Sequence, residues 1–351
     1  MQKVRPYILT KEFERKRKRK KAIEYILIII IIIMLGFIVL SKNMDSTDYY
    51  ELGNEYLENG QYDKAIEYYT EAIKLNQKSF EAFKQRGFAY YKKGQYNQAI
   101  EDYNMAIQLN PNEPEAYKNR GNVYCDKGEY DRAIEDYNKA IQLNPNYAEA
   151  YYNRGIAYVT QEQYDMAIED YNRAIQLNPN DAKAYYHLGN IFYKLGKYEQ
   201  AIEKYDIAIQ IDHNYDFAYN NRGLAYFNLG QYDLAIENYN TAIQINPKYA
   251  EAYSNRGAAY IKRGHYDLAV KDYNKAIYLN PAVALFYFNR GIAYRKKGDL
   301  LKALQDFNMA IQLDSNNALL YRNRGVVLKT LNKSFEAEQD FLKAIELESK
   351  R

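Results

Sequence analysis

Aromatic, glycine and alanine residues recur with a period of 34 along residues 46–351, which therefore divide into nine equal units. If the first residue of each unit is position 1, an aromatic residue occupies position 4, glycine position 8 and, in seven units, tyrosine position 11. These spacings place the three positions on one helix face. Positions 17, 20, 24 and 27, mainly tyrosine, alanine, aromatic and alanine, repeat the same logic. Each unit is predicted to be a pair of antiparallel amphipathic helices.

The ends of these helices carry their own signals. In the second unit, Lys92 and Lys93 precede Gly94, as expected for a last helical turn followed by a left-handed cap. Pro111 then disfavours a helical conformation in the residue before it, so the second helix ends there. A unit of this kind buries its apolar face only against its neighbours. The predicted units are 46–79, 80–113, 114–147, 148–181, 182–215, 216–249, 250–283, 284–317 and 318–351.

The third unit reads Tyr117-x2-Arg120-Gly121-x2-Tyr124, then Ala133-x3-Tyr137, then Pro145. It resembles the tetratricopeptide repeat, whose signature is W-x2-L-G-x2-Y, then A-x3-F, then P. Two departures recur: tyrosine replaces tryptophan at position 4, and arginine replaces leucine at position 7 in seven units. The resemblance covers residues 46–351. It implies an all-α, right-handed solenoid of nine helix pairs, with a concave groove that is lined by the first helices and binds peptides and proteins.

The first 45 residues have a different composition. Residues 1–22 are basic and include the run Arg15–Lys21, whereas residues 23–40 are apolar apart from Glu24. A helix of this length spans roughly 27 Å, close to the thickness of the hydrocarbon core of a bilayer. We predict a single transmembrane helix at 23–40 and a short linker at 41–45, which would hold the repeats close to the membrane.

The basic run gives this predicted helix an orientation. By the positive-inside rule, we expect the N-terminus in the cytoplasm and the repeats on the extracytoplasmic side of a bacterial cell membrane. A cleaved signal peptide is the alternative. The apolar run exceeds the usual length for one, and the A-x-A pattern is absent.

The repeats show little sign of catalytic or cofactor chemistry. The three histidines (His187, His213 and His265) lie far apart, and the glycines lack the sequence of a phosphate-binding loop. We predict that the protein is not an enzyme and needs no cofactor, metal or small-molecule substrate. Nucleic-acid binding is not expected, because residues 45–351 carry 37 basic against 42 acidic residues and 29 of the 41 tyrosines occupy core positions.

In tetratricopeptide-repeat proteins, which this chain resembles, the groove is lined by positions 2, 5, 6, 9, 12 and 13 of the first helices. Asparagine fills position 6 in six units: Asn119, Asn153, Asn221, Asn255, Asn289 and Asn323. These amides either pair with the backbone of an extended peptide or form hydrogen bonds between helices of the array. The sequence leaves both interpretations open.

Some family members bind a peptide's C-terminal carboxylate with five residues from three consecutive repeats. The resemblance implies such a clamp from the third unit onward, because four of the five residue types match and a histidine stands where arginine is usual. The candidate residues are Lys118, Asn122, Asn153, Lys183 and His187. Asparagine is common at these positions throughout the chain, so about two of the matches are unsurprising. Protonated histidine can donate to a carboxylate.

Three functions are compatible with this organisation. The favoured one is an anchored scaffold that binds protein or peptide partners on the extracytoplasmic side. The second is a cytosol-facing receptor, similar to the mitochondrial outer-membrane import receptor, with a carboxylate clamp for chaperones. The third is a docking subunit of a membrane enzyme.

Overall fold

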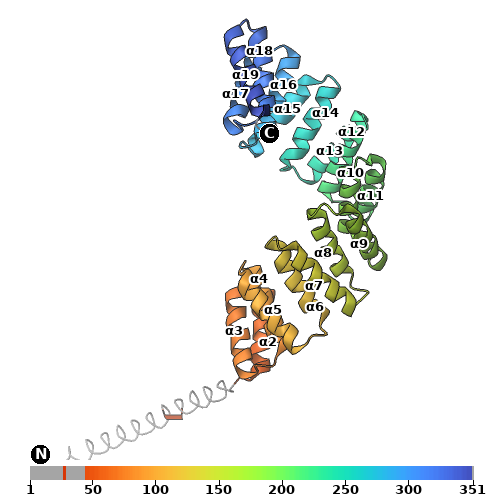
Figure 1. Ribbon diagram of the computed structural model, residues 1–351, viewed down its shortest axis with the longest axis vertical. Helices are drawn as coiled ribbons and strands as arrows, with labels where there is room; N and C mark the ends of the chain where they lie inside the picture. The colour runs from red at the N-terminus through yellow and green to blue at the C-terminus, as the bar shows by residue number, and fades with distance from the viewer. Residues whose placement is uncertain (1–26, 29–43, 350–351) are drawn as a thin grey trace, which may run out of the picture. The chain divides into compact units, whose positions relative to one another are not determined.

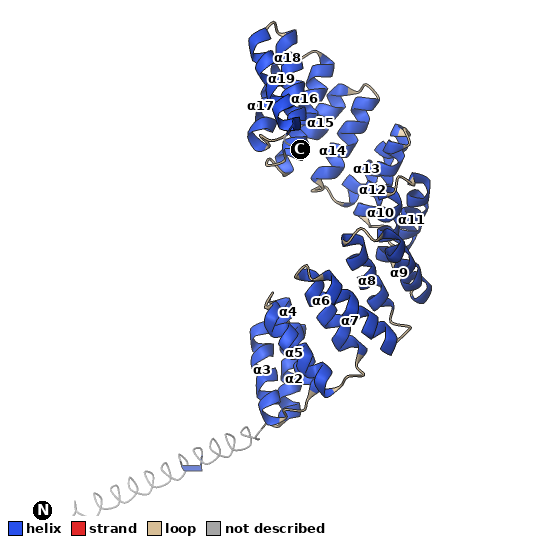
Figure 2. Cartoon of the chain, viewed as in Figure 1, coloured by secondary structure: helices blue, strands red, loops and turns tan. Residues whose placement is uncertain are grey.

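The structure, a computed structural model, describes residues 27–28 and 44–349, in which α-helices joined by short turns are the only regular secondary structure (Figure 2). It divides into two compact units, Met1–Leu143 and Asn144–Arg351. The first unit contains α2 (Ser46–Glu58), α3 (Tyr62–Leu75), α4 (Phe80–Lys92), α5 (Tyr96–Leu109), α6 (Pro114–Asp126) and α7 (Tyr130–Leu143).

The second unit continues the alternation with six further helix pairs (Figure 1). Its helices are α8 (Ala148–Thr160), α9 (Tyr164–Leu177), α10 (Ala182–Lys194), α11 (Tyr198–Ile211), α12 (Asp216–Asn228), α13 (Tyr232–Ile245), α14 (Ala250–Lys262), α15 (Tyr266–Leu279), α16 (Ala284–Lys297), α17 (Leu300–Leu313), α18 (Ala318–Thr330) and α19 (Ser334–Ser349). We call the even-numbered members first helices and the odd-numbered members second helices. The prediction of nine helix pairs is confirmed.

Small residues allow the two helices of a pair to lie close together. The alanines at positions 20 and 27 are at most 2% exposed in every repeat. The position-8 glycine lies against the ring at position 24: a Cβ atom on Gly121 would lie 2.8 Å from the ring of Tyr137, and one on Gly189 would lie 2.7 Å from that of Tyr205. Such contacts are too short for any larger residue, so the glycine and the aromatic ring specify each other.

The turn inside each pair depends on a left-handed residue at position 15. Seven repeats use glycine there, with positive φ, as at Gly94 (φ 72°). Glu162 and Asn332 adopt the same conformation without being glycine, with φ of 59° and 60°. Second helices end where the Asn-Pro sequence predicts: α5 stops at Leu109, before Asn110 and Pro111.

The predicted transmembrane segment at 23–40 lies outside the described residues, apart from Leu27 and Ile28. Within the described part of the chain, no helix is both long and apolar enough to span a membrane. The anchor therefore stays a prediction.

Candidate partner-binding surface

The first helices form a layer of their own. In the second unit α10 contacts α12, α12 contacts α14 and α14 contacts α16; in the first unit α2 contacts α4 and α4 contacts α6. Positions 2, 5, 6, 9, 12 and 13 point to one side of each of these helices. We call the surface that they form the first-helix face.

On α10, α12 and α14 an asparagine network links three successive repeats. The Asn255 amide donates to Asn220 Oδ1 (2.9 Å), and the Asn220 amide donates to Asn221 Oδ1 (3.0 Å). Asn221 in turn donates to Asn190 Oδ1 (2.9 Å) and to the Tyr186 hydroxyl (3.1 Å). Asn221 and Asn255 therefore serve the array itself.

The remaining predicted groove residues behave differently. Asn323 donates to the Leu319 carbonyl of its own helix (2.8 Å). Asn289 is half-buried, and its side-chain amide makes no hydrogen bond to any described residue. Of the two interpretations of position 6, helix–helix hydrogen bonding thus holds at Asn221 and Asn255, whereas the side-chain amide of Asn289 is available to a partner.

Asparagines at position 9 have a further role inside their own repeats. The buried Tyr137 hydroxyl donates to Asn122 Oδ1 (2.8 Å), and Tyr205 donates to Asn190 in the same way (2.7 Å). Where position 9 is apolar, as in the repeats of Tyr239 and Tyr273, the tyrosine hydroxyl is buried without a hydrogen-bond partner among the described residues. Asn122, a predicted clamp residue, is therefore already engaged by the repeat that contains it.

The structure divides the five clamp candidates between the two units. Lys118 and Asn122 lie on α6 of the first unit, whereas Asn153 lies on α8 and Lys183 and His187 on α10 of the second. Lys183 is exposed, and its backbone amide is capped by the Asp181 carboxylate (3.0 Å).

His187 lies among three tyrosine rings. It stacks on Tyr171, with ring centroids 5.8 Å apart, and meets Tyr152 and Tyr186 edge-on at 5.7 and 5.3 Å. Burial lowers the pKa of the His187 imidazole below its ordinary value; Asp181 opposes this shift and Lys183 adds to it. The ring is therefore neutral at physiological pH, which weakens its role as a cationic carboxylate ligand. It retains one N–H donor.

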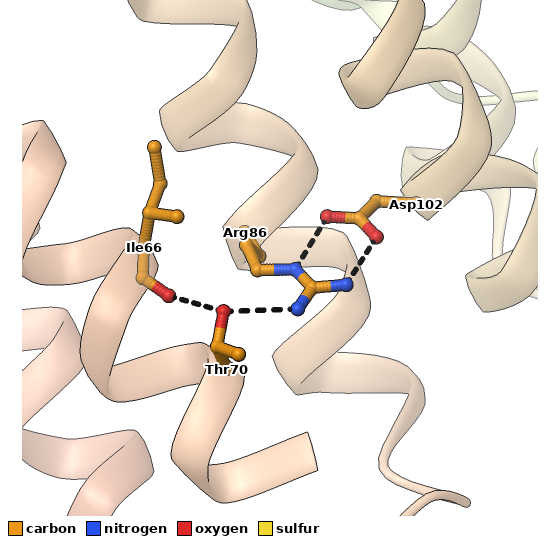
Figure 3. A network of polar contacts seen from close by, with 4 residues as sticks. All are labelled: Ile66, Thr70, Arg86 and Asp102. Atoms are coloured by element: carbon orange, nitrogen blue, oxygen red, sulfur yellow. Dashed lines mark hydrogen bonds and ion pairs between the residues drawn. The ribbon is translucent and has the colours of Figure 1, made fainter. Parts of the chain in front are cut away.

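The arginine at position 7, which replaces the leucine of the family signature, forms hydrogen bonds within its own repeat and to the preceding repeat (Figure 3). Arg86 donates from Nε and Nη2 to the two oxygens of Asp102, at position 23 of its own repeat (2.8 and 2.7 Å). Its Nη1 donates to Thr70, at position 25 of the preceding repeat (3.0 Å). Burial raises the pKa of the Asp102 carboxyl, and the bonds and charge of Arg86 oppose this shift.

The same arrangement recurs at Arg120, Arg256, Arg290 and Arg324, each with its aspartate and an asparagine of the preceding repeat. In the sixth repeat the carboxylate has changed position: Arg222 bonds Asn238 in its own repeat and Asp206 in the preceding one. In the fifth repeat Leu188 replaces the arginine and Lys204 the aspartate. The sequence shows that arginine at position 7 and aspartate at position 23 recur together. Their contact could not be predicted from helical periodicity, because the two positions are 16 residues apart and lie on different helices.

The described residues contain no group of three or more histidine, cysteine or acidic side chains that could hold a metal ion. Burial raises the pKa of the Cys125 thiol, which does not favour a reactive thiolate.

Solved structures similar to this chain are other helical-repeat proteins. One is the APC/C hetero-tetramer Cut9-Hcn1, at 18% identity and a TM-score of 0.58, over 76% of this chain and 52% of that one; this chain thus spans about half of its length. Another is a tetratricopeptide repeat protein from Parabacteroides merdae, at 21% identity and a TM-score of 0.56, over 71% and 99%. YrrB, described as a TPR protein with an unusual peptide-binding site, is 27% identical over 53% of this chain and 96% of its own, with a TM-score of 0.46. No curated protein matches the chain.

Family profiles match the repeats themselves. The TPR repeat profile matches 53–94, 87–125, 121–162, 157–196, 189–230 and 225–264, and the tetratricopeptide repeat profile matches 250–282 and 284–317. These stretches include the tyrosine, glycine and alanine positions that build the core. The chain belongs to the tetratricopeptide-repeat family, whose members act as scaffolds for proteins and peptides.

Proposed function

We propose that this protein is a membrane-anchored scaffold that binds partner proteins on the first-helix face of its repeats, on the extracytoplasmic side. The binding role is supported by apolar side chains that are exposed on this face. The array uses its asparagines and arginines to satisfy its own polar groups, yet four large apolar side chains on the first helices remain exposed. They are Phe217 (48%), Leu285 (55%), Leu319 (52%) and Val326 (40%).

The anchor and its orientation rest on the sequence. The apolar segment 23–40 follows the basic run Arg15–Lys21, and in this arrangement the repeats are carried across the membrane. The test is protease protection of a tag placed after Arg351, in intact cells and in sealed vesicles of known orientation. Digestion of the tag from outside intact cells supports the proposal. Protection until the membrane is broken contradicts the orientation, and release of the protein by alkaline carbonate contradicts the anchor.

A second candidate is the cytosol-facing receptor with a carboxylate clamp. The exposed Lys183 favours it, since this side chain is available to an acidic ligand. Binding of a peptide with a free acidic C-terminus would be measured before and after Lys183→Ala. A charged hydrogen bond contributes roughly 1.5–3 kcal/mol, so affinity should fall accordingly. A loss below about 0.5 kcal/mol would exclude the clamp.

A further inference from the structure

The last two repeats present an apolar strip on the first-helix face. Leu285 is the second residue of α16 and Leu319 the second residue of α18, and both are more than half exposed. Between these two helices, Phe288 and Ile292 pack beside Val327 and are only partly buried. Figure 1 shows α14, α16 and α18 following one another at the C-terminal end of the second unit. The strip therefore runs across neighbouring helices.

Positive charge borders this strip. Lys262, Lys296 and Lys329 are exposed in the last turns of α14, α16 and α18, and Arg295 lies beside Lys296. None of the four forms an ion pair within the described residues. The adjacent cations do: Arg263 pairs with Asp233 (3.0 Å) and Lys297 with Asp267. Glu251 is the one carboxylate among the eighteen first-helix-face positions of these repeats.

Ordinary helix chemistry accounts for part of this pattern. Cations near a helix C-terminus are stabilised by the helix dipole, and scattered exposed apolar residues are common. The dipole does not explain why three successive helices lack acidic partners for these cations. Among the first helices that the structure describes, exposed large apolar residues occur only on α12, α16 and α18. An apolar strip with an unpaired basic border is thus specific to this end of the array.

We infer that the first-helix face of α14, α16 and α18 binds an acidic amphipathic segment of a partner protein, with leucine- or phenylalanine-type side chains on the strip and carboxylates against Lys262, Arg295, Lys296 and Lys329. This inference rests on the proposed scaffold function and names the chemistry of its ligand. The Asn289 amide, which has no partner in the described chain, lies on the same face and supplies a donor for the segment's backbone.

A second copy of this chain fits the face less well. The first-helix face of the first three repeats carries five carboxylates: Glu51, Glu58, Glu81, Glu115 and Asp126. However, no large apolar side chain is exposed on α2, α4 or α6, so this surface supplies the charge without the apolar half. Helix-in-groove recognition needs both on one ligand.

The test measures binding of a fluorescein-labelled peptide to the full chain in phosphatidylcholine nanodiscs, with empty nanodiscs subtracted. The peptide has leucines at helical spacing, glutamates elsewhere and a C-terminal amide, which removes the ligand of a carboxylate clamp. Saturable binding is expected, weakened by added salt. A peptide of the same composition in scrambled order, and one with lysine in place of glutamate, should bind at least tenfold more weakly.

Two double variants separate the apolar and charged contributions. Leu285→Ser with Leu319→Ser, and Lys296→Glu with Lys329→Glu, should each weaken binding about tenfold or more. Leu301→Ser and Lys275→Glu are the matched controls, because both residues are exposed on second helices. Neither control should change affinity. Because all six side chains are exposed, unchanged helicity by circular dichroism is expected and would be checked.

Three kinds of result would overturn the inference. One is equal binding of the scrambled peptide, or no effect of either double variant. Another is no peptide binding, together with capture of phosphatidylglycerol vesicles that the lysine variants abolish; this result would assign the face to lipid. The third is binding of only a peptide with a free acidic C-terminus, lost in Lys183→Ala. In that case the scaffold function would stand and this surface would not be its site.

Discussion

The fifth and seventh repeats have the same helices, the same buried alanines and the same glycine–tyrosine contact, yet they differ in what fills the space between positions 7 and 23. In the seventh repeat, Arg256 bonds both oxygens of Asp272 and also Asn240 of the preceding repeat. In the fifth, Leu188 is buried, and within the part of the chain that the structure describes Lys204 pairs only with its neighbour Glu203. An apolar residue and a polar network thus occupy the same place in one fold. The backbone fixes the available volume, and either solution is acceptable because the buried Arg256 guanidinium has its carboxylate in Asp272.

Removal of the carboxylate from the arginine–aspartate network of the seventh repeat should have the largest effect on stability. Asp272→Ala leaves the Arg256 guanidinium, which is mostly buried, without its carboxylate. Loss of one partner of a buried pair costs about 3–5 kcal/mol, so the urea-unfolding midpoint of the full chain should fall sharply. The matched change Lys204→Ala in the fifth repeat should cost about 0.5 kcal/mol or less. Equal effects of the two changes would show that the network contributes no stability.

The arginine–aspartate network can be introduced into the fifth repeat by two substitutions. Leu188→Arg alone buries a charge beside Lys204 and should cost on the order of 2–3 kcal/mol. Lys204→Asp in addition should recover most of this loss, because Asn172 already stands at position 25 of the preceding repeat. The double-mutant cycle, measured by urea unfolding, should give a coupling above about 1 kcal/mol. Additive effects would mean that position 7 does not face position 23 in this repeat.

A change in the shared part of the core should act independently of the network. Ala201→Trp places a large ring where the native side chain is fully buried between helices. Overpacking costs about 1–3 kcal/mol or more, measured as a lower melting temperature. Gln200→Trp, on the exposed side of the same helix, is the control. An unchanged melting temperature in Ala201→Trp would show that the core face is assigned wrongly.

The smallest expected effect is the pH response of His187, which also belongs to the fifth repeat. Burial holds the pKa of its imidazole below the unfolded value near 6.5. The unfolded chain therefore binds a proton first as pH falls. The stability contributed by neutral His187 is present above about pH 6.5 and is lost as pH falls through the lowered folded pKa.

The variant His187→Asn, which restores the asparagine common at position 6, removes this contribution. Its unfolding midpoint should fall less between about pH 7 and pH 5 than that of the unmodified chain. Parallel pH profiles would show that the three surrounding tyrosines do not desolvate the ring.

Much of the fold was predictable because its signals are local and repeated. The spacing of Gly121 and Tyr137 and the Asn-Pro sequence after Leu109 were sufficient to predict helix pairs and where the second helix ends. The site was less predictable. The sequence identified the amides of Asn221 and Asn255 but left open whether they bind a ligand, and in the structure they bond across helices to Asn190 and Asn220. The carboxylate clamp and the membrane anchor remain predictions.

The family and the helix pairing follow from the amino-acid sequence, because a 34-residue period with small and aromatic residues at fixed helical spacing admits one way of burying the apolar faces. The roles of the residues that depart from the repeat pattern become visible in the folded structure. Arg86 reaches two other helices, His187 is enclosed by aromatic rings, and Leu285 and Leu319 remain uncovered. These contacts and exposures depend on which side chains, far apart in the sequence, lie next to one another in the folded chain. Period and composition do not specify those contacts, since a buried arginine–aspartate pair in one repeat and a leucine in another fill the same space.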